Sequence, residues 1–289
     1  MVQPSRQAAM HSRRPAAVAT LLLLALAVSL QQTAARTVTQ EELVGTRRLC
    51  ATCVKKTIKT STGAIQGAIP IGYVGSPQTR NGAYYLPRGW QNRELPVMIM
   101  LHGSGLSGSY QIGIYRKLAD EYKFIIIAPD SHLNMNWYVP SDTTKSFTTD
   151  FWHILACYRY VRDLKNVRFN KRKILVAGNS RGGYAAISFA TRTTFPTHGM
   201  VTHSNWYYYQ TGNHKVPIWC STGTTDPLFP PREMRTHIDY FKQRRPGWDI
   251  TLKAFYGGHT QYNKGELKAS IDWWYDKTGA IGRGPDSGP

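Results

Sequence analysis

Residues 174–186 read ILVAGNSRGGYAA, and this stretch decides the expected fold. An apolar run of strand length leads directly into Gly-x-Ser-x-Gly, and a helix-like Gly-Tyr-Ala-Ala follows. A strand that turns this sharply into a helix holds its serine in a strained backbone conformation, and the flanking Gly178 and Gly182 avoid collisions with neighbouring elements. The pentapeptide alone often arises by chance, but between such a strand and such a helix it predicts that Ser180 is presented as a nucleophile.

The same turn indicates where developing negative charge would be stabilised. The main-chain N–H of Arg181 lies in the first turn of the expected helix, whose amino end favours an oxyanion. A second donor should come from the turn HGSG at 102–105, which follows the apolar strand 96–101. We expect the main-chain N–H of Ser104 to be that donor and His102 to shape the loop rather than to react.

Elimination reduces the number of candidates for the carboxylate partner of Ser180. In folds built on such a turn, an acid and then a histidine follow the serine along the chain. No Asp or Glu lies between Asp163 and Asp226. The remaining candidates before the C-terminal histidine are Asp226, Glu233, Asp239 and Asp249. Only Asp226 directly follows an expected buried strand, so it is the predicted acid; the alternative is that it merely caps a turn or a helix.

Two histidines follow Asp226, and their surroundings separate them. His237 lies inside an expected helix, whereas His259 lies in a glycine-flanked loop, FYGGHT, after a strand. Such a loop allows an imidazole to fit between a serine hydroxyl and a carboxylate. His259 is therefore the predicted general base, with Nε2 toward Ser180 and Nδ1–H toward Asp226. The earlier histidines are expected to be surface or core residues: His198, His203 and His214.

Strand-like and helix-like segments alternate along the chain, which predicts an α/β fold with a mostly parallel central sheet and helices on both faces. The expected strands are 96–101, 124–128, 173–177, 200–203, 216–220 and 251–255, and the expected helices are 114–122, 151–164, 183–192, 233–244 and 264–274. Segments 63–73 and 83–86 are expected to form an antiparallel hairpin at the sheet edge.

The N-terminus has the features of a secretory signal. Three arginines precede an uncharged, mostly apolar run, and the small residues Thr33-Ala34-Ala35 suit a cleavage site. The alternative is an uncut anchor, although the run is shorter than the ~20 residues that span a bilayer. The expected organisation is a signal at 1–35, an N-terminal extension at 36–62, one α/β domain at 63–276 and a disordered tail at 277–289. We therefore expect an extracellular protein.

The chain is strongly basic, with 36 Lys and Arg against 17 Asp and Glu and a formal net charge of +19. A basic surface attracts acidic polymers and anionic surfaces, although a diffusely cationic protein is the simpler reading. No cluster resembles a nucleic-acid-binding arm. No metal cluster, phosphate loop or dinucleotide fingerprint is apparent, so no cofactor is expected.

Four cysteines are present, and three pairings are open in an oxidising compartment. Cys50 and Cys53 are spaced as CATC, which we interpret as a structural disulfide rather than a redox or zinc motif. Cys220 lies in an apolar run and is expected to be buried as a small hydrophobe.

With these residues identified, the chain resembles the α/β-hydrolase superfamily over about residues 63–276. Within it, the chain is similar to the secreted esterases and depolymerases, which include feruloyl esterases and polyhydroxybutyrate depolymerases. The resemblance rests on the motifs HG at 102–103, GNSRGGY at 178–184, DPLFP at 226–230 and GGH at 257–259. It implies hydrolysis of carboxylic esters through an acyl-enzyme.

Two other functions remain open. The GxSxGGY string also resembles prolyl-oligopeptidase-type peptidases, although this chain has no room for their propeller domain. A protein that kept the fold without turnover and binds acidic polymers is the other alternative. For specificity, the long segment 133–147, with Trp137, and the aromatic run after another strand, with Trp206, are candidate substrate contacts. Both tryptophans could equally serve packing.

Overall fold

The computed structural model describes residues 57–59, 63–70, 81–91, 93–131, 137, 149–205, 211–259 and 263–279. All of them belong to one compact unit, Thr46–Pro289. The predicted signal at 1–35, the pair Cys50 and Cys53 and the tail from residue 280 onward lie outside the described residues.

The described strands form a single sheet in the order β1-β2-β3-β5-β4-β6-β7-β8-β9. Their bounds are β1 Thr57–Lys59, β2 Ile65–Ile69, β3 Gly82–Leu86, β4 Glu94–Leu101, β5 Ile125–Pro129, β6 Arg168–Asn179, β7 Gly199–His203, β8 Ile218–Gly223 and β9 Ile250–Phe255. From β5 to β9 all neighbouring strands are parallel. The strands β1, β2 and β3 add an antiparallel extension on the β5 side.

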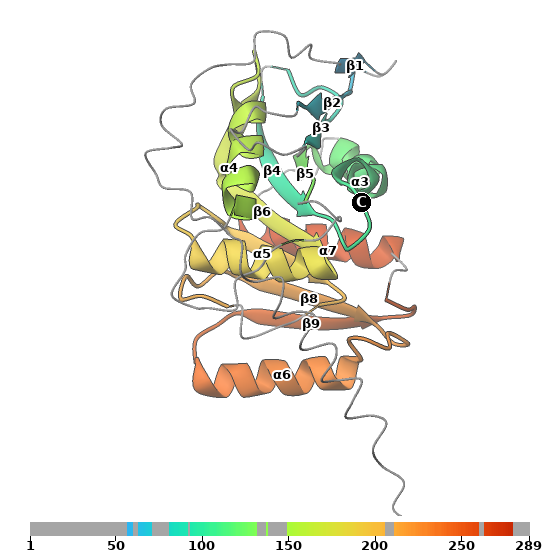
Figure 1. The fold of residues 1–289 in the computed structure, drawn as a ribbon, viewed down its shortest axis with the longest axis vertical. Coiled ribbons are helices and arrows are strands. Elements are labelled where there is room, and N and C mark those ends of the chain that lie inside the picture. Colours follow the sequence, from blue (N-terminus) through green and yellow to red (C-terminus); the bar gives the residue numbers. More distant parts are fainter. Residues whose placement is uncertain are drawn as a thin grey trace, which may run out of the picture. The chain divides into compact units, whose positions relative to one another are not determined.

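Helices cover both faces of this sheet, as the sequence predicts (Figure 1). Their bounds are α3 Gly108–Tyr122, α4 Thr149–Arg162, α5 Arg181–Arg192, α6 Pro231–Arg244 and α7 Lys264–Lys277. Apolar side chains of α4, α5 and α6 pack into one buried cluster, and those of α3 and α7 pack into a second. Because both faces are covered, strands such as β5 and β7 are buried along their whole length.

The strand order reverses its direction at β4. The chain runs from β4 to β5 on one side of β4 and then returns to β6 on the other side. In parallel sheets such a reversal separates the loops that leave two neighbouring strands and creates a binding crevice between them. Here those loops carry His102-Gly103 after β4 and Ser180 after β6.

The expected strands and helices are all present, and the differences have local causes. Helix α3 begins at Gly108, six residues before the expected Ile114, because the Ser107 side chain caps it by accepting from the Tyr110 N–H. Gly108 is required there, since a Cβ atom would lie 2.0 Å from the Ala128 carbonyl oxygen. Strands β2 and β3 pair as the predicted hairpin, but β1 lies outside them at the edge of the sheet.

In the described part of the chain, no helix is both long enough and apolar enough to span a membrane.

Candidate active site

The turn after β6 holds Ser180 in an unusual backbone conformation. Its φ is 48° and its ψ is −119°, a combination that a non-glycine residue rarely adopts. The neighbouring glycines make this turn possible: a Cβ at Gly178 would lie 2.2 Å from the Gly182 oxygen, and one at Gly182 would lie 2.2 Å from the Leu101 oxygen. The structure thus shows the strained strand-to-helix turn that residues 174–186 predict.

Hydrogen bonds fix both main-chain polar groups of Ser180. Its N–H donates to the carbonyl oxygen of His203, at 2.9 Å. Its carbonyl oxygen accepts from the Tyr184 N–H at 3.2 Å and from Nδ2 of Asn205 at 2.6 Å. The end of β7 therefore holds the turn from one side, while α5 begins on the other.

The three side chains predicted as a triad lie within hydrogen-bond distance of one another. His259 Nε2 is 2.8 Å from Ser180 Oγ, and His259 Nδ1 is 2.9 Å from one Asp226 oxygen and 3.1 Å from the other. A carboxylate only accepts, so His259 carries its proton on Nδ1 and donates it to Asp226. Nε2 is then the acceptor for the Ser180 hydroxyl, which is the arrangement a general base requires.

The Asp226 carboxylate lies on the loop after β8 and is only 3 % exposed. Burial by itself would raise its pKa, but donated hydrogen bonds from the Phe229 N–H, the His259 ring and the Leu228 N–H outweigh burial and lower it. The two main-chain bonds measure 3.0 and 2.9 Å. Asp226 thus stays ionised and can hold the His259 tautomer.

The loop that carries His259 is tied to the Asp226 loop. The N–H and the hydroxyl of Thr225 both donate to the Gly257 oxygen, at 3.0 and 2.9 Å. The Phe229 ring stacks on the imidazole with centroids 5.7 Å apart and planes at 20°. These contacts fix the imidazole between serine and carboxylate, and Phe229 is a contact that the sequence reasoning did not single out.

His102 shapes its loop rather than facing the serine. Its Nδ1–H donates to the Gly103 oxygen at 2.8 Å, and its Nε2 accepts from the Ser131 N–H at 2.9 Å. Burial lowers the pKa of this imidazole. The loop passes beside the nucleophile turn, because a Cβ on Gly103 would lie 3.6 Å from the Cβ of Ser180. Ser104 comes next, and its role as an oxyanion donor stays a prediction.

Of the two tryptophans predicted as substrate contacts, Trp137 lies among the described residues. Trp137 is 1 % exposed, its Nε1–H donates to the His102 oxygen at 2.7 Å, and its own carbonyl accepts from Nε of Arg181 at 3.3 Å. These contacts agree with the packing alternative, and a substrate contact for Trp137 stays a prediction. Trp206 lies outside the described residues.

A buried polar network behind the Ser180 turn was missed by the sequence reasoning. His203 Nε2 lies 2.8 Å from the Tyr115 hydroxyl, and its Nδ1 lies 2.7 Å from Ser221 Oγ and 3.2 Å from a Glu266 oxygen. The other Glu266 oxygen accepts from Trp219 Nε1 at 3.0 Å. The sequence places His203 at a strand end but gives no signal that α3 and α7 supply its partners.

The Glu266 carboxyl group of this network is ionised. Burial would raise its pKa, yet the His203 ring and hydrogen bonds from Ser221 and Trp219 hold it below the usual range. A charged carboxylate is thus buried beside the apolar cluster of α3 and α7, where Trp219 of that cluster donates to it.

Neither thiol in the described chain acts in the site. Cys220 is fully buried, and burial raises the pKa of its thiol, as expected for a cysteine that serves as a small hydrophobe. Cys157 is also buried, with Sγ 3.6 Å from His153 Nε2. Within the described residues, no group of three or more His, Cys, Asp or Glu side chains is placed to hold a metal ion.

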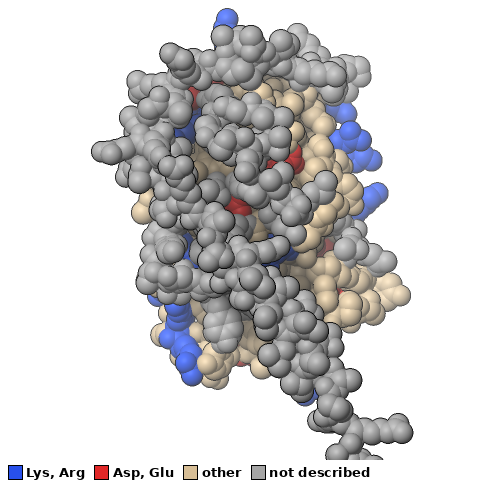
Figure 2. Space-filling model, in the orientation of Figure 1, with Lys and Arg blue, Asp and Glu red and all other residues tan. Residues whose placement is uncertain are grey.

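The basic charge lies on the surface. On the face shown in Figure 2, lysine and arginine atoms appear mainly along the margins, and few acidic atoms are visible among the described residues.

The sheet order, the helices on both faces and the strained serine turn after β6 define an α/β-hydrolase fold. No family model matches the chain, and no curated protein matches it. Solved structures do match. The fluorophosphonate-binding serine hydrolase F of Staphylococcus aureus, substrate bound, is 17% identical with a TM-score of 0.53, covering 76% of this chain and 97% of its own.

Two further structures show the same likeness. An S-formylglutathione hydrolase from Agrobacterium tumefaciens is 16% identical with a TM-score of 0.52, covering 78% of this chain and 99% of its own. Esterase 2 of Thermogutta terrifontis, phosphorylated by paraoxon, is 14% identical with a TM-score of 0.53, covering 69% and 89%. At these identities the likeness establishes the fold, and the chain spans most of each neighbour.

Proposed function

We propose that the protein is a serine hydrolase that cleaves carboxylic esters through an acyl-enzyme. One observation carries the proposal: the Ser180 hydroxyl, the His259 imidazole and the Asp226 carboxylate form a continuous hydrogen-bonded chain of 2.8 and 2.9 Å. The strained Ser180 backbone supports the same conclusion, because strain of this kind persists where the structure holds a side chain in position for reaction.

In the first half of the reaction, Ser180 Oγ attacks the ester carbonyl carbon while its proton passes to His259 Nε2. Collapse of the tetrahedral adduct breaks the carbon–oxygen bond of the ester, and His259 returns the proton to the departing alkoxide. In the second half, water replaces serine in the same steps, which releases the acid and restores Ser180. Asp226 keeps the ring oriented and stabilises the imidazolium throughout.

Developing charge on the carbonyl oxygen needs two donors near Ser180. Arg181 is the first residue of α5, so its N–H has no acceptor within the helix. The loop of Gly103 and Ser104 passes beside the serine. We propose that the main-chain N–H of Ser104 is the second donor to the carbonyl oxygen. Each such donor contributes on the order of 3 kcal/mol to transition-state stabilisation.

Ester substrates are favoured by the neighbouring structures. One of them is an S-formylglutathione hydrolase, another is an esterase phosphorylated by paraoxon, and the third is a fluorophosphonate-binding serine hydrolase. The motif resemblance to secreted feruloyl esterases and polyhydroxybutyrate depolymerases narrows the proposed substrates to esters of polymers or of cell-wall material.

Labelling with a fluorophosphonate probe tests the proposal, alongside turnover of short-chain p-nitrophenyl esters. We expect the wild type to be labelled and active and Ser180→Ala to lose both. Ser188→Ala is the matched control, because it removes a buried hydroxyl from the same helix at a position outside the site. A folded wild type that is neither labelled nor active on any ester would contradict the proposal and favour a binding protein with a hydrolase fold.

We also propose that the protein acts outside the cell after removal of residues 1–35. The support is the charged, apolar and small-residue pattern of that segment. N-terminal sequencing of the protein recovered from the medium should begin near Arg36. Mass mapping of the same sample should show Cys50 joined to Cys53, and an intact N-terminus in a membrane fraction would instead support the anchor.

A further inference from the structure

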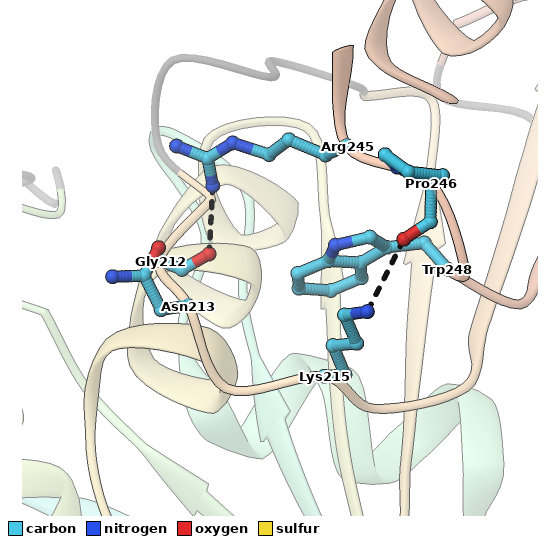
Figure 3. A pocket seen from close by; sticks show the side chains of 6 residues that line it. All are labelled: Gly212, Asn213, Lys215, Arg245, Pro246 and Trp248. Atoms are coloured by element: carbon cyan, nitrogen blue, oxygen red, sulfur yellow. Dashed lines mark hydrogen bonds between the residues drawn. The ribbon is translucent and has the colours of Figure 1, made fainter. Parts of the chain in front are cut away.

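A hollow lies at the amino ends of β8 and β9, whereas Asp226 and His259 lie beyond their carboxyl ends. Figure 3 shows the hollow. It has a volume of about 380 Å³ and is lined by Gly212, Asn213, Lys215, Arg245, Pro246 and Trp248. The lining segments precede β8 and β9, whereas Asp226 and His259 follow these same two strands. A strand of this length spans roughly 20 Å. The hollow is therefore separate from the catalytic site.

Its two walls are held together by two cationic side chains. Arg245, directly after α6, donates from Nη1 to the oxygens of Thr211 and Gly212, at 3.1 and 2.9 Å. Lys215, on the facing wall, donates from Nζ to the Pro246 oxygen at 3.1 Å. Each cation thus reaches across to the opposite wall, and Figure 3 shows the bond from Arg245 to Gly212 and the bond from Lys215 to Pro246. Both charges are fixed in place before any ligand arrives.

Several donors of these cations remain for a ligand. A guanidinium carries five N–H groups, and an ammonium carries three. Among the described residues, the Nε and Nη2 hydrogens of Arg245 and two Lys215 hydrogens have no protein acceptor. A guanidinium fork of this kind matches the two oxygens of a carboxylate. The rim is therefore prepared to bind an anion.

Among the described residues, no acid forms an ion pair with Lys215 or Arg245. Asp249, next to Trp248, is paired with Lys277 at 2.7 Å. Arg244 adds another cation beside Arg245, with its guanidinium over the Tyr240 ring. Since the whole chain also carries a net charge of +19, the field around the hollow favours anions.

The hollow also has an aromatic wall. Trp248 is 7 % exposed, so only a small part of its indole lines the hollow, between the two cations (Figure 3). An edge-to-face contact with Phe241, with ring centroids 5.3 Å apart, fixes the ring. Hollows of a few hundred Å³ accept small organic groups rather than bare ions. The exposed part of the indole is an apolar patch flanked by two cations, which suits a small ring that carries a carboxylate, such as a uronic acid.

We propose that this hollow is an ancillary binding site for a uronate residue of an acidic polysaccharide. The carboxylate binds between Arg245 and Lys215, and the sugar ring lies against Trp248. The site holds the polymer at the amino ends of β8 and β9, the end of the sheet remote from Ser180. The inference does not depend on the proposed esterase activity, because binding is measured without turnover.

Calorimetric titration with an oligogalacturonate at low salt tests the site. The double variant Lys215→Gln/Arg245→Gln should bind about tenfold more weakly than the wild type, since charge-assisted hydrogen bonds are lost. The double variant Arg235→Gln/Lys253→Gln removes the same charge from exposed positions on α6 and β9 and should change affinity less than about twofold, as expected for general attraction alone. Equal weakening in both pairs, or no binding by the wild type, would overturn the proposal.

Additional arms separate the ligand chemistries. The fully methyl-esterified oligogalacturonate keeps the rings without the charge and should not bind to Ser180→Ala, a background that excludes its hydrolysis through Ser180. Trp248→Phe should weaken binding of the oligogalacturonate but not of inorganic polyphosphate. Binding of the ester form, or an equal effect of Trp248→Phe on polyphosphate, would overturn recognition of a charged sugar.

A single variant and two measurements test whether weaker binding results from loss of folding. Lys215→Gln alone leaves the Arg245 bonds to the facing wall and should by itself weaken binding. Turnover of small esters and melting temperature should stay at wild-type values in this single variant, which separates failure of this site from failure of the esterase proposal.

Discussion

The main-chain N–H of Ser180 donates to the carbonyl oxygen of His203 at 2.9 Å, which joins the reactive turn to the end of β7. The His203 ring, in turn, contacts Tyr115 on α3 and Glu266 on α7. The helices of the far sheet face thus help to hold the turn. The geometry of the Ser180 turn therefore depends on this buried network as well as on the glycines of the turn, and mutations can test each of the two.

Replacement of Gly182 by alanine should destabilise the whole fold. The added Cβ would lie 2.2 and 2.4 Å from the oxygens of Leu101 and His102, which are main-chain atoms of β4 and its loop. We expect a loss of several kcal/mol in unfolding free energy, a size typical of overpacking a rigid site. Gly113→Ala on α3 is the control, because no atom lies within 4 Å of its Cβ. It should stabilise the protein by up to about 1 kcal/mol, and equal denaturation midpoints for the two variants would contradict this account.

The serine turn could be predicted from sequence because its causes are local. Gly178, Ser180 and Gly182 are spaced by the turn itself. Asp226 stood out because acids are absent over a long stretch before it, and His259 stood out because it lies in a glycine-flanked loop after a strand. The structure places the side chains of Ser180, His259 and Asp226 in hydrogen-bond contact.

The supports of that turn could not be predicted in the same way. Asn205, Tyr115 and Glu266 act on the site only through contacts between elements far apart in sequence. The start of α3 was missed because Gly108 and Gly113 are poor helix formers, and close packing on Ala128 explains Gly108 only once the fold is known.

Asn205→Ala should reduce turnover more than substrate binding. The variant removes the bond from Nδ2 to the Ser180 oxygen, which keeps the Tyr184 N–H as its other donor, and one such hydrogen bond contributes about 0.5–1.5 kcal/mol. Because the lost contact orients the nucleophile, kcat should fall by up to about tenfold, as for roughly 1.4 kcal/mol of transition-state stabilisation, while KM changes little. Steady-state kinetics and the rate of fluorophosphonate labelling measure the effect. Asn213→Ala is the control, because Asn213 is exposed and precedes β8, at the opposite end of the sheet from Ser180. A change in KM alone would argue against a role of Asn205 in orienting Ser180.

Asp226→Asn should leave the fold intact and nearly abolish turnover. The asparagine oxygen can still accept from the N–H groups of Leu228 and Phe229. Its NH2 group, however, donates to Nδ1 of His259 and favours the tautomer whose Nε2 cannot take the serine proton, so kcat should fall by about 10³–10⁴-fold. Asp239→Asn, an exposed acid on α6, is the matched control. Equal activity of the two variants would exclude Asp226 as the orienting acid.

The acid dependence of stability should change when Glu266 is replaced by glutamine. The folded state lowers the pKa of Glu266 from its ordinary 4.5, so ionised Glu266 stabilises the fold above that pH, and this contribution disappears as pH falls through the lowered value. Glutamine resembles the protonated acid. The wild type should therefore melt at a higher temperature than Glu266→Gln near neutral pH, and the gap should close below about pH 4.5. Asp226 is lowered in the same sense and destabilises both proteins in acid, so the difference between the two melting curves is the quantity to follow. A gap that stays constant from neutral pH to pH 3 would show that the charge on Glu266 contributes nothing to the network behind Ser180.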